Sequence, residues 1–169
     1  MTTIAKSNPT ARPLPRIRFC RPLVDLAATA AALDLDREHA VALIEDGRLE
    51  WAWNMARRGS KARTIRVLAA SIETLQRHRS NPSRTGESDW EYVFGLILPG
   101  GQVRPGIVAK TSTIELAGRF MLDGSFVHQL LRDGEFEPIK GTRCRRGRHG
   151  SPEVTIASVQ SFLKRRRIA

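Results

Sequence analysis

One stretch of this chain occurs twice, and the repetition constrains the architecture more than any motif does. Residues 24–79 align with residues 111–166 at a constant offset of 87 positions and without a gap. The best-matched segments read LIEDGRLE at 43–50 and LLRDGEFE at 130–137. A repeat of this length is typical of one structural unit that occurs in tandem. The sequence therefore predicts two similar small domains, called here the first copy and the second copy.

The size of the chain agrees with this division. At 169 residues there is room for two small domains, each near the size at which a single hydrophobic core is only just sufficient. We therefore expect the copies to be stabilised by packing against each other or against a partner. No apolar run reaches membrane-spanning length, and the N-terminal sequence lacks the apolar segment of a secretory signal. These features predict a cytoplasmic protein.

The charge is strongly basic and unevenly distributed. The net charge is +11, with a pI near 11.1. Residues 23–50 carry −5 and residues 51–79 carry +6, while residues 111–141 carry −2 and residues 142–169 carry +7. Each copy thus has an acidic front half and a basic back half. One basic face indicates a polyanionic partner, and nucleic acid is the usual one.

The domain organisation follows from composition and from the repeat. We predict a flexible basic arm over residues 1–18, because the segment is rich in proline and has no acid. A polar linker is predicted over 80–89. The first domain then covers 19–79 and the second covers 90–169.

Within the first copy the pattern predicts five elements. They are a helix over 23–33, a helix over 37–46, a strand over 49–55, a strand over 64–67 and a helix over 71–78. Asp36 is suited to cap the second helix, and Gly47 is suited to end it. The order helix, tight turn, helix, two-stranded wing, helix is that of a winged helix-turn-helix.

The second copy repeats this order. Its predicted elements are a helix over 114–121, a helix between Asp123 and Gly134, strands over 136–143 and 153–156, and a helix from Ser158. Between the copies, residues 90–98 alternate apolar and other side chains, so a β-hairpin with residues 102–108 is predicted. The aromatic face of this hairpin would pack on the second copy or make a domain–domain or dimer contact. The predicted fold class is α+β, with two tandem winged helix-turn-helix domains and an additional β-hairpin between them.

The residues at these positions resemble a known family, the excisionase-like, MerR-type winged helix-turn-helix. In the second copy the resemblance lies in Leu122-Asp123, Val127, Leu130-Leu131, Gly134-Glu135-Phe136, Val154-Thr155-Ile156, Ser158-Val159 and Phe162 to Arg166. In the first copy it lies in Leu35-Asp36, Leu43-Ile44, Gly47-Arg48-Leu49, Ile65-Arg66-Val67, Ser71-Ile72 and Leu75. The resemblance implies a small DNA-binding protein that acts as a transcription regulator or recombination directionality factor. Members are usually single modules, so the tandem and the central hairpin are departures.

In a helix-turn-helix, the second helix enters the major groove and presents its N-terminal residues to base edges. The candidate DNA-binding positions there are Arg37, Glu38 and Ala42 in the first copy, and Gly124, Ser125, His128 and Gln129 in the second. An ordinary solvent-facing helix surface is the alternative interpretation. The first copy's helix is acidic, which weakens its case.

The wings and the last helix supply the basic candidates for phosphate contact. They are Arg57, Arg58, Lys61 and Arg63 in the first copy, Arg143, Arg145, Arg146, Arg148 and His149 in the second, and Lys164 and Arg165 near the end of the chain. Such contacts would give an affinity that falls steeply with salt. Trp51 and Trp53 could stack on bases, but packing beneath the wing is the favoured interpretation.

The sequence offers little for catalysis. It contains no GxxxxGK, HExxH or GxSxG motif, and Cys20 and Cys144 have no partner at metal-ligand spacing. A non-enzymatic protein without cofactor or metal is therefore predicted.

The leading hypothesis is sequence-specific binding to double-stranded DNA in the nucleoid, with two sub-sites read about one helical turn apart (~10 bp). The main alternative is an interaction adaptor. In that case the acidic first copy or the 90–98 hairpin holds a protein partner from a recombinase, replication or packaging machinery, and only the second copy binds DNA. DNA bending and replication initiation are further alternatives.

Overall fold

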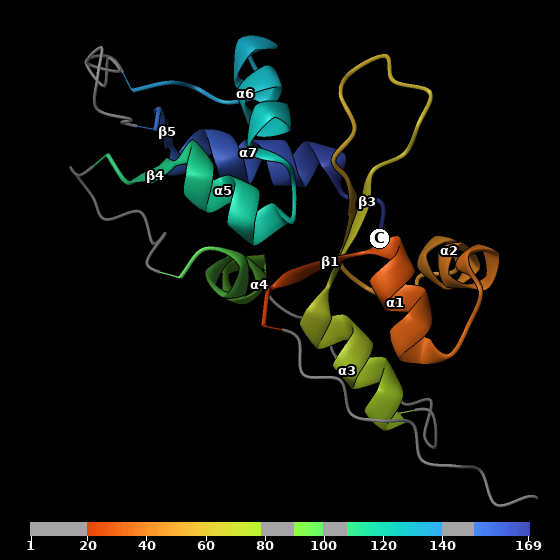
Figure 1. Cartoon of the computed structure of the whole chain (residues 1–169). Helices are drawn as coiled ribbons and strands as arrows, with labels where there is room; N and C mark the ends of the chain where they lie inside the picture. Colours follow the sequence, from red (N-terminus) through yellow and green to blue (C-terminus); the bar gives the residue numbers. More distant parts are fainter. Residues whose placement is uncertain (1–19, 79–89, 100–107, 140–150) are drawn as a thin grey trace, which may run out of the picture.

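The computed structural model describes residues 20–78, 90–99, 108–139 and 151–169. Within these residues the fold is α+β, with seven helices and two small antiparallel sheets (Figure 1). The predicted basic arm, the predicted linker and most of the second wing lie outside the described residues. None of the described helices combines the length and the apolar character needed to cross a membrane.

The two copies place their elements at matching positions. The first copy consists of β1 (Leu23–Asp25), α1 (Leu26–Leu33), α2 (Arg37–Glu45), β2 (Ala52–Asn54), β3 (Ile65–Leu68) and α3 (Ala69–His78). The second consists of β4 (Lys110–Ser112), α5 (Thr113–Phe120), α6 (Gly124–Arg132), β5 (Glu153–Thr155) and α7 (Ile156–Arg166). The starts of α1 and α5, and those of α2 and α6, differ by the offset of the sequence repeat. The register also recurs, since Leu23 pairs with Leu68 and Lys110 with Thr155.

The turns between the helices depend on a few side chains at equivalent positions. The caps of α1 and α5, Asp34 and Met121, adopt left-handed backbone conformations with φ of 54° and 49°. Asp123 then accepts a hydrogen bond from the Ser125 backbone N–H at 2.7 Å and caps α6, as predicted. Gly134, with φ of 74°, follows α6 in the conformation that favours glycine.

The same arrangement holds in the first copy. Asp36 caps α2 by accepting from the His39 backbone N–H at 2.8 Å, and Gly47 follows α2 with φ of 69°. The predicted capping aspartates and terminating glycines of both copies are therefore confirmed.

The three-stranded sheet of the first copy, ordered β1-β3-β2, separates two hydrophobic clusters. Alternate residues of a strand face opposite sides of a sheet. Val24 and Val67 belong to a cluster whose buried members all come from the first copy. Leu23, Trp53 and Leu68 belong to a larger cluster with the core of the second copy. The first copy therefore buries one face of its sheet in its own core and the other against the second copy.

Two further contacts join the copies at this sheet. The Arg66 guanidinium on β3 donates hydrogen bonds to the backbone carbonyls of Phe120, at 2.9 Å, and of Met121 at the end of α5. Past α7, the chain runs along β2: the Ile168 N–H donates to the Ala52 carbonyl at 2.7 Å, and the Ala52 N–H to the Ala169 carbonyl at 3.1 Å. The outer edge of β2 is therefore covered by the last residues of the second copy.

The predicted hairpin over 90–98 is wrong. Residues Trp90–Ile97 form the helix α4, which packs into the shared cluster. Both patterns fit this segment, since alternation joins Trp90, Tyr92 and Phe94 while helical spacing joins Trp90, Val93, Phe94 and Ile97. The structure buries Val93, Phe94 and Ile97 and leaves Tyr92 63% exposed, as a helix requires. The other predicted hairpin strand lies largely outside the described residues.

Several predicted boundaries are also wrong. Residues 23–25 form a strand rather than the start of the first helix, because they pair with β3. The predicted strand over 49–55 is confined to β2, since Trp51 has φ of 64°, which breaks the extended backbone. In the described part of the predicted strand 136–143, Pro138 makes only an isolated bridge to Val154. Helix α7 begins before Ser158, because Thr155 is its cap.

Candidate nucleic-acid interface

Helix α6 presents a neutral-to-basic surface. Val127 and Leu130 are buried and hold the helix against the second copy's core. The opposite side exposes the candidate residues Gly124, Ser125 and His128, with Gln129 half-buried. No acidic residue occurs between Gly124 and Arg132. The exposed side of this helix can therefore approach an anion without repulsion from its own side chains.

The start of α6 is fixed by its cap. Hydrogen bonds from Ser125, including its backbone N–H, lower the pKa of Asp123. The charged cap compensates the partial positive charge of the helix N-terminus.

Helix α2 presents a different surface at equivalent positions. Its candidate residues Arg37, Glu38 and Ala42 are exposed, as predicted. At the end of the helix, Glu45 accepts from the Arg63 guanidinium at 3.1 Å. At its start, hydrogen bonds from the backbone N–H and ring of His39 lower the pKa of Asp36. Acids therefore occur along the exposed side of α2.

The repeat register shows how far the two surfaces have diverged. Glu38 on α2 corresponds to Ser125 on α6, and Glu45 corresponds to Arg132. Arg132 is exposed, and our sequence analysis did not include it. The alignment of the copies could have found it, because a cation replaces an acid at the equivalent helix position.

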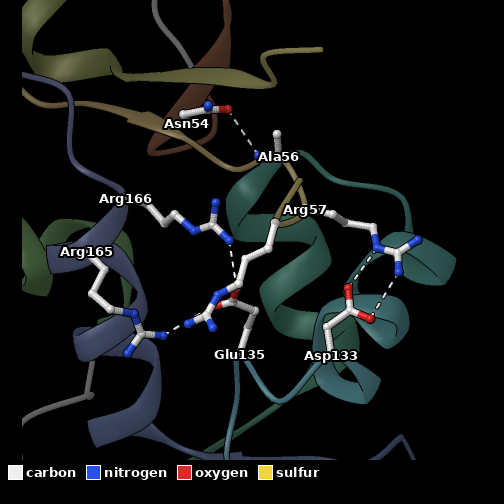
Figure 2. A network of polar contacts seen from close by, with 8 residues as sticks. Asn54, Ala56, Arg57, Asp133, Glu135, Arg165 and Arg166 are labelled. Carbon is white, nitrogen blue, oxygen red and sulfur yellow. Dashed lines mark hydrogen bonds and ion pairs between the residues drawn. The ribbon is translucent and has the colours of Figure 1, made fainter. Parts of the chain in front are cut away.

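The basic loop between β2 and β3 reaches the second copy. Arg57 donates two hydrogen bonds to the Asp133 carboxylate, at 2.7 and 3.0 Å (Figure 2). The charged hydrogen bonds from Arg57 lower the pKa of Asp133. Arg58 pairs with Glu135 at 2.9 Å, while Lys61 is exposed and makes no ion pair within the described residues. Asp133 is the C-cap of α6, so this loop lies at the C-terminal end of that helix.

One buried carboxylate, that of Glu135, forms ion pairs with three arginines. The Glu135 side chain is 1% exposed and pairs with Arg166 at 2.6 Å, Arg165 at 3.1 Å and Arg58 at 2.9 Å. Figure 2 shows Arg165 and Arg166 converging on Glu135 from α7. Burial raises the pKa of Glu135, but hydrogen bonds from Arg166 and Arg165 and the charges of Arg166 and Arg58 outweigh it and lower the pKa. We call these four residues the Glu135 cluster.

Two other basic residues near the end of the chain, the candidate Lys164 and also Arg167, lie on aromatic rings. The Lys164 Nζ is 5.4 Å from the centroid of the Trp90 ring, and the Arg167 guanidinium is 3.8 Å from that of Trp51. Both are cation–π contacts. Trp51 and Trp53 are 4% and 0% exposed, so they are core residues as predicted, but they pack in the cluster shared with the second copy rather than in the small core of their own copy.

The second wing, with Arg143, Arg145, Arg146, Arg148 and His149, lies outside the described residues. Within the part of the chain that the structure describes, no group of three or more His, Cys, Asp or Glu residues could hold a metal ion. The Cys20 thiol is free and exposed.

Comparison of the chain with protein-family models, curated proteins and solved structures finds no match. The resemblance to the excisionase-like family therefore stays a prediction.

Proposed function

We propose that the protein is a non-enzymatic, sequence-specific binder of double-stranded DNA, built from two winged helix-turn-helix units. It would act in the nucleoid as a transcription regulator or recombination directionality factor. The observation that carries the proposal is the exposed surface of α6, which has no acid along its length and ends beside a basic loop.

The size of α6 supports this use. An α-helix with its side chains is about 10–12 Å across, which suits a major groove about 12 Å wide. The α5–α6 pair is held by buried Val127 and Leu130, so the exposed side keeps a fixed orientation. Gln129 can bond an adenine edge, and Arg132 is long enough to reach a phosphate.

Binding and its salt dependence provide the test. We expect fluorescence anisotropy to show tight binding to duplex DNA that weakens steeply as salt rises. Replacing Gln129 by alanine should relax sequence choice at one base pair, worth about 1–3 kcal/mol, in a randomised-site selection. Replacing Arg132 by alanine should weaken binding to all sequences. A wild-type chain that does not bind duplex DNA would contradict the proposal.

A second candidate function is favoured by the acids of α2. In the adaptor hypothesis α2 holds a protein partner and does not lie against DNA. Replacing Glu38 and Glu45 by glutamine distinguishes the two roles within the full chain. If α2 faces DNA, the double variant binds DNA more tightly, because two charges that repel phosphate are gone. If α2 serves a protein partner, DNA affinity is unchanged.

A further inference from the structure

We propose that the loop of residues 57–63 in the first copy completes the DNA-contact surface of α6 in the second copy. It does so by pairing Arg57 and Arg58 with the two carboxylates at the C-terminal end of α6, Asp133 and Glu135, and by carrying the exposed Lys61 in the same loop. The inference rests on the proposed function of α6. It assigns the first copy a direct part in the DNA contact of the second.

The C-terminal end of α6 is, by itself, unfavourable for a phosphate backbone. The helix dipole places partial negative charge there. Asp133 caps this end and Glu135 follows two residues later, which adds two formal negative charges. When α6 lies in a groove, its ends point toward the phosphate strands that border the groove. An uncompensated acidic end would therefore repel one of these strands.

The loop removes this repulsion. Arg57 meets Asp133 through two parallel charged hydrogen bonds, the strongest geometry for an arginine and a carboxylate. Arg58 joins Arg165 and Arg166 on Glu135, so three cations surround one buried carboxylate. The loop residues are 46% exposed at Arg57 and 72% exposed at Arg58, so both guanidinium groups also face solvent.

The loop is held in place at its base. The Asn54 side-chain oxygen accepts hydrogen bonds from the backbone N–H groups of Ala56, at 3.1 Å, and Thr64, at 3.0 Å. The Met55 N–H donates to the Thr64 carbonyl at 2.8 Å. In Figure 1 the loop rises from β2 and β3 beside α6. Lys61 lies in this loop, exposed and without an ion pair among the described residues, so its charge is available to phosphate.

The same loop does not compensate α2 to the same degree. Its Arg63 pairs with Glu45, the last residue of α2. The next residue, Asp46, is exposed and makes no ion pair within the described part of the chain. The loop thus touches the C-terminal ends of both second helices but leaves an acid uncovered only at α2. This asymmetry assigns the loop to α6.

The test uses the full chain, a random-sequence duplex and anisotropy across a salt series. Lys61→Ala should reduce the slope of log affinity against log salt by about 1 and weaken binding severalfold near 0.1 M salt, as for the loss of one phosphate contact. The matched control is Arg77→Ala, which removes one cation from α3, remote from α6 in Figure 1. We expect the control to bind as wild type does.

A second pair of variants tests the neutralisation itself. Arg57→Ala should weaken binding more than Lys61→Ala, because it uncovers Asp133 as well as removing a cation. Adding Asp133→Asn should restore most of the lost affinity, since the repelling charge is then gone. Circular dichroism of each variant checks that it is folded. Lys61→Ala removes no ion pair or side-chain hydrogen bond among the described residues, so it still tests the proposal if Arg57→Ala unfolds.

The outcomes separate the two proposals. Wild-type binding to duplex DNA, together with Lys61→Ala and Arg57→Ala variants that match Arg77→Ala, would overturn this inference and leave the proposed function standing. Failure of the double variant to recover affinity would overturn the neutralisation. A wild-type chain that ignores duplex DNA would overturn the proposed function, and this inference with it.

Discussion

Helices α2 and α6 occupy the same position in the two copies but offer opposite surfaces. Each starts after a capping aspartate, Asp36 or Asp123, and is followed by a glycine of positive φ, Gly47 or Gly134. The exposed side of α2 carries acids, whereas α6 has none along its length. The backbone of this unit therefore depends on a few caps, turns and core residues, and its surface is free to take another role.

The sheets of the two copies also differ, in size and in what covers them. The first copy has three strands, and their outer face is buried against the second copy, whereas the second copy has two strands in the described residues. The first copy thus supplies the central layer of the molecule and the loop that pairs with α6. The second copy supplies the surface best suited to nucleic acid. If α6 binds DNA as proposed, the first copy is the supporting copy and the second is the reading copy.

The largest effect is expected for the hydrophobic cluster that both copies share. Trp53→Ala removes a side chain that is 0% exposed between the copies, and we expect it to lower the free energy of unfolding by about 3–5 kcal/mol. Because one cluster spans both copies, the chain should unfold in a single transition. Denaturant unfolding followed by far-UV circular dichroism and by tryptophan fluorescence should give coincident curves.

A control substitution in the core of the first copy tests whether the two copies unfold together. Ile44 is buried in the cluster whose buried members are all from the first copy. Ile44→Ala should also shift both curves together, by about 2–5 kcal/mol. If either variant instead separates the two curves, the copies unfold independently and the supporting role of the first copy is wrong.

Much of the local structure could be predicted because its causes are local. An aspartate before an apolar helical pattern and a glycine after it fix the ends of α2 and α6 from adjacent residues. Helix α4 could not be predicted, since Trp90 and Phe94 satisfy both the alternating and the helical spacing. Only the surface against which the segment packs distinguishes the two, and that surface comes from both copies.

The candidate site was predictable in position but not in its connections. The exposure of Arg37, Glu38 and His128 follows from helical periodicity, and the structure confirms it. The partners of Arg57 and Arg58 lie in the other copy, 76 or more positions away along the chain. No local pattern signals such a pair, because it depends on how the copies pack.

The Glu135 cluster has no equivalent in the first copy, because a different residue occupies the position of Glu135 there. Arg48 occupies the equivalent position in the first copy and is exposed. We expect Glu135→Gln to lower the free energy of unfolding by about 1–3 kcal/mol, because a buried charged acceptor is lost from three arginines. Arg48→Gln should change it by less than about 0.5 kcal/mol. Equal effects would contradict the asymmetry between the copies.

The ion pairs of Glu135 make the stability of the folded chain depend on pH. The pKa of Glu135 is lower in the folded chain than its ordinary value of 4.5. Its contribution to stability is therefore present above pH 4.5 and is lost as the pH falls through the folded pKa. Thermal unfolding measured from neutral to acidic pH should show that the wild-type chain loses stability below pH 4.5, the ordinary pKa of a glutamate. The Glu135→Gln variant should show a smaller loss over the same range.

The smallest effects test whether the two backbones are equivalent. Gly47 and Gly134 have φ of 69° and 74°, and an added Cβ would meet nothing within 4 Å at either position. Replacing either glycine by alanine should therefore cost only the left-handed backbone conformation, about 1 kcal/mol. Asparagine tolerates that conformation better and should cost less at both sites. Thermal unfolding of the four variants measures this, and a clear difference between the two alanine variants would show that the helix ends are not equivalent in the two copies.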